Sequence, residues 1–190
     1  MLFRSRANGF LKGMGIDVPK LEDMKSRADS GKYTTGAGGD YQIACLEATG
    51  ANEDGGRAGM EKCLAANPDI NVVYTINEPT AFGAAAALKA AGKKIGTDVI
   101  IVSVDGGLAG VQAVQAGDIQ ATSQQYPLKM AEEGVKAIAT IAAGGAPPTP
   151  TSANGQFFDT GVTLCTDTPQ DTVTAAKQET AQYCIDNAWG

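Results

Sequence analysis

The sequence predicts an α/β fold built on a parallel, doubly wound sheet. Short apolar, β-branched runs alternate with alanine- and glycine-rich segments that have helical spacing. The clearest run, residues 98–104, is mostly apolar on both faces, which is typical of a central strand. In residues 71–91 another apolar run stops at Asn77, and a small-residue helix follows directly. Parallel strands bring such junctions to one edge of the sheet, where α/β proteins bind ligands.

The amino-terminal part of the chain is poorer in strands. Residues 4–14 have the apolar spacing of a short amphipathic helix, and residues 15–41 form a polar loop with room for one helical turn. Residues 43–48 are a strand candidate. Residues 57–66 predict a helix, which ends at Pro68 because proline cannot continue the hydrogen-bond ladder.

The alternation of strands and helices continues to the end of the chain. After the strand at 72–76 and the helix at 80–91, the strand at 98–104 is expected to lead into six further segments. These are a helix at 108–116, a strand at 119–124, a helix at 128–143, a Pro/Gly linker at 144–151, a strand at 157–166, and a helix or extended tail at 172–187.

The composition excludes several classes of function. The net charge of −6 argues against nucleic acid or an anionic membrane surface as partner, because both require basic patches. No apolar run approaches the length of a membrane span. The absence of histidine removes Ser-His-Asp and Cys-His catalysis and most zinc sites. No GxGxxG pattern follows the first strand, so no dinucleotide cofactor is expected.

The four cysteines lack the CxxC spacing of metal and thioredoxin-type sites, so no metal is expected. Cys165 and Cys184 could form a disulfide in an oxidising compartment. Four buried thiols are an equally good interpretation.

Three polar residues directly follow predicted strands, namely Asn77, Asp105 and Gln125. The two amides can donate and accept hydrogen bonds, whereas an ionised Asp only accepts. This set suits vicinal hydroxyls, and hence a neutral polyol, better than an anion, which would require Arg, Lys or a glycine-rich amide cradle.

Each of these residues also has a purely structural interpretation. Asn77 could cap its helix, Asp105 could cap the next helix or hold a turn with Gly106, and Gln125 could be an ordinary loop residue. By local pattern alone, three charged residues are expected to face solvent or helix termini: Arg6, Glu53 and Glu78.

Seven segments together carry a resemblance to a known family. In order they are residues 6–10 (RANGF), 53–60 (EDGGRAGM), 67–79 (NPDINVVYTINEP), 101–107 (IVSVDGG), 121–127 (ATSQQYP), 158–164 (FDTGVTL) and 189–190 (WG). Their order and spacing resemble the periplasmic sugar-binding proteins of ABC transporters with the ribose-type, or type I, fold. The fructose-binding members are the nearest subgroup.

The resemblance implies a non-enzymatic receptor whose two α/β lobes close on a monosaccharide, fructose or a similar sugar. Such receptors are periplasmic monomers that deliver the sugar to a membrane permease. In this family the positions of Asn77, Asp105, Gln125 and Arg6 hydrogen-bond the sugar hydroxyls. Ribose-type members place a stacking aromatic where this chain has Ala-Asn; this departure argues against ribose and makes Asn52 an additional candidate contact.

The resemblance also implies that one lobe is incomplete. Family members carry a whole amino-terminal lobe, preceded by a signal peptide, before the segment equivalent to Arg6. Residues 4–124 and 157–190 are therefore expected to form the carboxyl-terminal lobe, whereas 125–150 would hold a helix of the other lobe. That helix would expose Met130, Val135 and Ile138, and this chain alone would bind sugar weakly or not at all.

Two alternative functions fit the same fold. The effector-binding domain of a sugar-responsive transcription repressor shares it, but the acidic balance and the Trp-Gly ending favour transport. An α/β enzyme that uses Asp105 as acid or base lacks a histidine or lysine partner.

Overall fold

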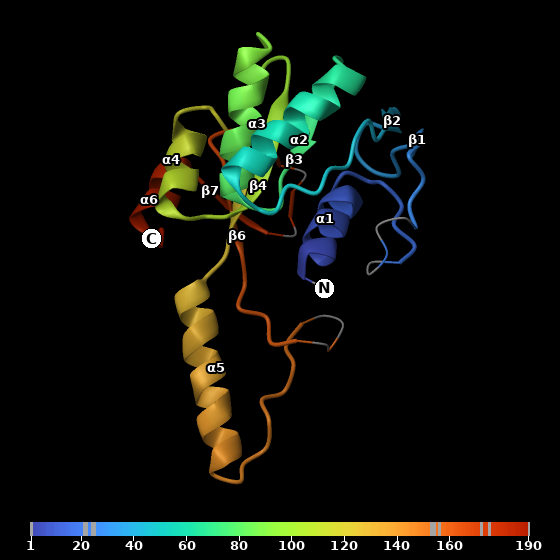
Figure 1. The fold of residues 1–190 in the computed structure, drawn as a ribbon. Coiled ribbons are helices and arrows are strands. Elements are labelled where there is room, and N and C mark those ends of the chain that lie inside the picture. Colours follow the sequence, from blue (N-terminus) through green and yellow to red (C-terminus); the bar gives the residue numbers. More distant parts are fainter. Residues whose placement is uncertain are drawn as a thin grey trace.

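A computed structural model describes residues 2–20, 23, 26–152, 155, 157–171, 173–174 and 176–189. Their centre is a five-stranded sheet in the order β3-β4-β5-β6-β7 (Figure 1). The strands are β3 (Val72–Tyr74), β4 (Ile100–Asp105), β5 (Ala121–Gln124), β6 (Thr163–Cys165) and β7 (Lys177–Glu179). The predicted α/β class is confirmed.

One pair of neighbouring strands is antiparallel, so the sheet is mixed rather than fully parallel. Strands β3, β4 and β5 are parallel to one another, as are β6 and β7, but β5 and β6 run in opposite directions. Between β5 and β6 the chain leaves the sheet at the carboxyl end of β5, forms helix α5 (Pro127–Ala142), and re-enters the sheet at that same end. A connection that returns to the same edge makes the two strands antiparallel.

The main core lies between the sheet and two helices, α2 (Glu53–Ala66) and α3 (Glu78–Ala90). Small residues let these helices approach closely. A Cβ atom added at Gly83 would lie 1.9 Å from the carbonyl oxygen of Glu53. Leu88 and Ile101 are fully buried in this layer and pack α3 against β4.

Three further helices lie in the described part of the chain. Helix α1 (Leu2–Gly13) lies at the amino terminus, and α4 (Leu108–Gln115) packs beside α6 (Ala181–Asp186) near the carboxyl terminus (Figure 1). Two disulfides add covalent links. Cys45–Cys63 joins the segment before α2 to α2 itself, and Cys165–Cys184 joins β6 to α6. The structure therefore pairs all four cysteines, which excludes the interpretation as buried thiols.

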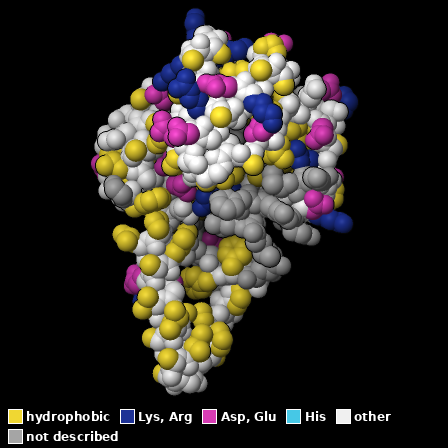
Figure 2. Space-filling model, in the orientation of Figure 1, with side chains coloured by type: hydrophobic (Ala, Val, Ile, Leu, Met, Phe, Trp, Pro, Cys, Tyr) yellow, Lys and Arg dark blue, Asp and Glu magenta, His cyan; other side chains and the backbone are white. Residues whose placement is uncertain are grey.

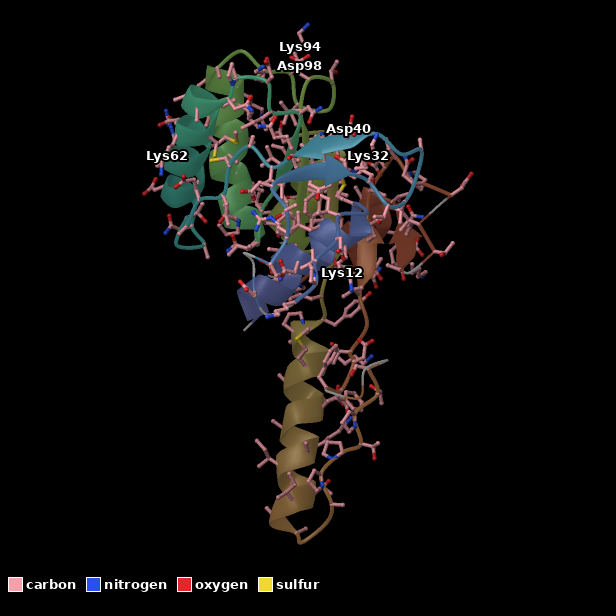
Figure 3. The ribbon with its side chains drawn as sticks, turned by 90° about the vertical axis from the view of Figure 1, so that its right-hand side faces the viewer. Lys12, Lys32, Asp40, Lys62, Lys94 and Asp98 are labelled. Carbon is pink, nitrogen blue, oxygen red and sulfur yellow. A yellow bond between two sulfur atoms is a disulfide. The ribbon has the colours of Figure 1, made fainter. Side chains whose placement is uncertain are left out.

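Several element predictions were wrong in detail. The loop predicted at 15–41 contains a hairpin of β1 (Ser30–Lys32) and β2 (Asp40–Gln42), across which Lys32 and Asp40 pair at 3.4 Å (Figure 3). Of the strand predicted at 157–166, only β6 forms a strand. The expected helix or tail at 172–187 contains both β7 and α6.

The segment predicted as a strand at 43–48 belongs to no strand and has no regular secondary structure. Among the described residues it hydrogen-bonds to no neighbouring strand, and a strand without a partner leaves its backbone groups unpaired.

Helix α5 projects away from the sheet, with apolar side chains along its length (Figures 1 and 2). None of its residues is buried; Val135 is 68% and Ile138 69% exposed, and Met130 is exposed as well. No helix in the described part of the chain is long and apolar enough to cross a membrane.

Candidate ligand-binding site

Three of the candidate side chains, Arg6, Asp105 and Gln125, form one hydrogen-bonded group at the carboxyl ends of β4 and β5. The Arg6 guanidinium donates from Nη1 to Oδ1 of Asp105 and from Nη2 to Oε1 of Gln125, both at 3.2 Å. The amide of Gln125 donates to the same Asp105 oxygen at 2.8 Å. These side chains come from α1, from the last residue of β4 and from the residue after β5, so the fold brings together positions that are distant in sequence.

The group is largely shielded from solvent. The side chains of Arg6 and Asp105 are 17% and 16% exposed, and Arg6 Nη1 also donates to the carbonyl oxygen of Ile76 at 2.9 Å. The expectation that Arg6 is a solvated helix residue is therefore wrong. Burial raises the pKa of Asp105 above its ordinary value, although the neighbouring guanidinium opposes this shift.

An aromatic stack fixes the helix that carries Arg6. The ring of Phe10, one helical turn after Arg6, lies 4.6 Å from the ring of Tyr74 at an interplanar angle of 12°. Burial raises the pKa of Tyr74 to about 12. The stack anchors α1 on β3 and so holds the guanidinium over the ends of the strands.

The backbone of Asp105 is strained. Its φ angle is 144°, a conformation that residues other than glycine rarely adopt. The strain is offset by contacts that hold the next two residues: the buried carboxylate of Glu78 accepts from Gly106 N at 2.7 Å and from Gly107 N at 3.2 Å. It also accepts from the hydroxyl of Thr122 at 2.7 Å.

The prediction that Glu78 faces solvent or simply pairs with the helix terminus is wrong. Glu78 is 4% exposed, and burial raises its pKa, although its three donors oppose the shift. A Cβ atom at Gly110 would lie 1.8 Å from its carboxyl carbon, so a glycine is needed there. The sequence held a usable signal: Glu78, Ala81 and Ala85 share the buried stripe of α3 at helical spacing.

The carboxyl-terminal segment holds the same loop from the other side. The indole N–H of Trp189 donates to the carbonyl oxygen of Asp105 at 3.2 Å, and Leu108 N donates to the carbonyl oxygen of Trp189 at 3.1 Å. Sequence reasoning missed this role because no local pattern links a terminal tryptophan to a strand end far from it in sequence.

The other two candidates act as helix caps. Asn77 accepts from Thr80 N at 3.2 Å and donates to the carbonyl oxygen of Ala51 at 2.8 Å. Asn52 is exposed and accepts from Gly55 N at 2.8 Å. Neither bonds to the group around Asp105, although Asn77 directly follows Ile76, whose carbonyl oxygen binds Arg6.

The arrangement offers both donors and acceptors to a polar ligand. Arg6 and Gln125 line a cavity of about 1220 Å³ that extends between the sheet and α5. Within the described residues, no three His, Cys, Asp or Glu side chains come together in a way that could hold a metal ion.

Residues 12–146 match the family described as "Periplasmic binding protein domain". The ribose import binding protein of Escherichia coli is 36% identical over 85 residues, which are 45% of this chain and 28% of that protein. The D-apiose import binding protein of Actinobacillus succinogenes is 44% identical over 81 residues, which are 42% of this chain and 25% of that protein. This chain thus spans between a quarter and a third of the length of these curated relatives, both of which are named as binding proteins rather than enzymes.

A solved structure shows the same fold over most of the chain. The ABC transporter solute-binding protein of Agrobacterium vitis, with bound D-fucose, superposes with a TM-score of 0.60. The match covers 90% of this chain and 59% of that chain at 21% identity.

Proposed function

The chain belongs to the periplasmic binding protein domain family, and we propose that it forms part of a solute receptor that captures a monosaccharide for an ABC permease. In this proposal the receptor works in the periplasm. The two disulfides support that compartment, because disulfides persist where the surroundings are oxidising.

The observation that carries the proposal is the meeting of Arg6, Asp105 and Gln125 at the ends of adjacent strands. A sugar hydroxyl both donates and accepts, so it can bridge the Asp105 carboxylate and a donor from Arg6 or Gln125. Because the group is shielded from solvent, a ligand lacking one hydroxyl would leave a buried polar atom unpaired, at a cost of roughly 1–3 kcal/mol. Asn77 has one amide hydrogen left to donate at the rim of the site.

We propose fructose or a similar monosaccharide as the ligand. Residues Ala51 and Asn52, before α2, offer no aromatic ring on which a ribose-type ligand could stack, and Asn52 could contribute a polar contact. The two curated relatives are named for the import of ribose and D-apiose, and the solved structure contains D-fucose.

We further propose that residues 125–150 belong to a second lobe and that this chain holds half of the site. The exposed apolar side of α5 supports this division. So does the position of the cavity beside Arg6, which lies between the sheet and α5.

Nuclear magnetic resonance tests the site in this chain. Titration with fructose, ribose and xylose should shift the backbone signals of Asp105 and Gln125 and the indole signal of Trp189, the only tryptophan. The affinity expected for half a site is about millimolar or weaker, or about −4 kcal/mol. Asp105→Asn should remove the shifts. Asp118→Asn, at an exposed carboxylate paired with Lys89, should keep them.

Two results would contradict the proposal in different ways. If no sugar shifts the Asp105 and Gln125 signals more than those of exposed residues, these residues are not the binding site. If isothermal titration calorimetry gives micromolar affinity for one of the sugars, the site is real but the half-site argument is wrong.

A further inference from the structure

A buried glutamine lies directly behind the candidate site. Gln124 is the last residue of β5 and pairs in the sheet with Asp105, and the next residue, Gln125, belongs to the site. Successive side chains of an extended chain point to opposite faces. The side chain of Gln125 therefore reaches the ligand-facing group, whereas that of Gln124 is only 1% exposed on the other face.

The amide of Gln124 joins the loop of the site to helix α6. Its Nε2 donates to the carbonyl oxygen of Gly106 at 3.1 Å and to the carbonyl oxygen of Cys184 at 3.2 Å. Cys184 lies in α6 and is fully buried, and its disulfide to Cys165 fixes this part of α6 to β6. One side chain thus connects the loop that follows Asp105 to a covalently held element.

Two carbonyl oxygens converge on this buried position, and they account for the residue type. A single uncharged group with two N–H donors satisfies both oxygens, and asparagine and glutamine are the side chains that carry one. Lysine or arginine would bury a charge, and an apolar residue would leave both oxygens unpaired. The two hydrogen bonds, rather than packing alone, therefore explain a glutamine here.

The shape of the loop depends on the same contact. Gly106 has a φ angle of 75°, and a Cβ atom there would lie 2.3 Å from the side chain of Gln124. The glycine thus lets the Gln124 side chain pack directly against the loop. A larger residue at this position would force the two apart.

Both peptide groups that follow Asp105 are held at their nitrogen and at their oxygen. Glu78 accepts from the two N–H groups. The first carbonyl oxygen accepts from the indole of Trp189, and the second, that of Gly106, accepts from Gln124. A positive φ at a non-glycine residue persists only where the surroundings fix it, and Gln124 supplies one of the contacts that fix Asp105.

We propose that Gln124 is a positioning residue of the sugar site, which couples the conformation of Asp105 to helix α6. The inference rests on the proposed function, since it assigns a role in sugar binding to a residue that touches no sugar. Loss of the two hydrogen bonds lets Asp105 relax toward a negative φ. The apparent affinity for sugar then falls with the fraction of chains that keep the binding conformation.

Substitution of Gln124 tests the proposal by two measurements. Gln124→Met keeps the length of the side chain and removes both donors. The φ angle of Asp105, measured from the three-bond coupling between its amide proton and its Hα, should leave the positive region. The initial slope of a fructose titration, followed at the Asp105 and Gln125 signals, should fall about tenfold, because the strained conformation is then populated in fewer chains.

Gln115→Met is the matched control. Gln115 is an exposed glutamine at the end of α4, and its Nε2 also donates to α6, to Oε1 of Gln182 at 3.3 Å. It makes no bond to residues 105–107 among those of the described chain. The control should therefore leave both the φ angle of Asp105 and the slope of the titration unchanged.

A second variant covers the case in which Gln124→Met does not fold. In Gln124→Glu the protonated carboxyl group can donate to one of the two carbonyl oxygens, and burial favours this form. Its fructose response should be intermediate and should rise as the pH is lowered from about 8 to about 6. The comparison is with the parent chain at each pH, which carries the same Glu78 and Asp105.

The parent chain gives a test without any substitution. Linkage requires that sugar binding stabilise the contacts of Gln124 if these contacts favour sugar binding. Fructose should therefore slow the solvent exchange of the Gln124 side-chain amide protons and leave those of Gln115 unchanged.

The outcomes separate this inference from the proposed function. If fructose shifts neither the Asp105 nor the Gln125 signal of the parent chain, the proposed function is wrong and this inference is wrong with it. If the parent chain responds, and Gln124→Met keeps the same φ at Asp105 and the same titration slope, the positioning role alone is overturned. Exchange of the Gln124 amide protons that fructose does not slow would overturn it as well.

Discussion

At the scale of single residues, the site depends on a backbone conformation that Asp105 would not adopt alone. A positive φ at a non-glycine residue costs on the order of 1–3 kcal/mol and persists only where its surroundings fix it. Glu78 holds Gly106 and Gly107 from one side, and Trp189 holds the carbonyl oxygen of Asp105 from the other. The strain thus directs the Asp105 carboxylate toward Arg6 and Gln125.

Glu78→Ala should therefore destabilise the chain strongly. The substitution leaves the N–H groups of Gly106 and Gly107 and the hydroxyl of Thr122 without their acceptor, and it opens a cavity in the buried loop. We expect a loss of at least about 2 kcal/mol in the free energy of unfolding, measured by urea denaturation. Glu53→Ala, at an exposed acidic residue in the first turn of α2, should change it by less than about 0.5 kcal/mol. Equal losses in the two variants would show that the Glu78 contacts contribute no special stability.

At the scale of elements, periodicity was enough to find the helices and central strands, because their own side chains carry the pattern. Apolar runs that stop at a polar residue correctly predicted two features: the strand-to-helix junction at Asn77 and the strand that ends at Asp105. The segment at 43–48 has the same local signal but is no strand, because a strand is defined by a hydrogen-bonded neighbour and none of the described strands pairs with it. Trp189 was missed for a related reason, since its partners lie far away in sequence.

The two disulfides serve different elements and can be separated experimentally. Removing either pair by double Cys→Ala substitution should cost about 3 kcal/mol, since each closes a loop of 18 or 19 residues. Only loss of Cys165–Cys184 should alter the fluorescence of Trp189, because that disulfide ties α6, and with it the terminal segment, to β6.

The Cys45–Cys63 variant is the matched control. It should lower the unfolding midpoint by a similar amount and leave the emission maximum of Trp189 in the folded state unchanged. An emission shift in this variant alone would mean that Trp189 is not held by α6.

At the scale of the whole molecule, the chain has two parts of different character. The sheet, α2 and α3 enclose a continuous core, whereas α5 extends from the sheet without a buried residue. The apolar spacing of α5 correctly predicted a helix, and the space-filling view shows how much apolar surface it presents (Figure 2). Sequence alone could not place this helix, because an apolar stripe indicates that a helix packs against another surface but does not identify that surface.

A charge-introducing variant of α5 tests whether this apolar face contributes to the stability of the 190-residue chain. Val135 and Ile138 are 68% and 69% exposed, so replacing both with lysine removes little buried area and should change the free energy of unfolding by less than about 0.5 kcal/mol. The same substitution at Ile101, which is fully buried between the sheet and α3, should prevent folding.

Self-association at high concentration, measured by sedimentation velocity, should fall in the Val135→Lys/Ile138→Lys variant, because exposed apolar stripes drive association. A loss of stability above about 1 kcal/mol would instead mean that α5 packs against the chain's own sheet, and the proposal that residues 125–150 belong to a second lobe would have to be abandoned.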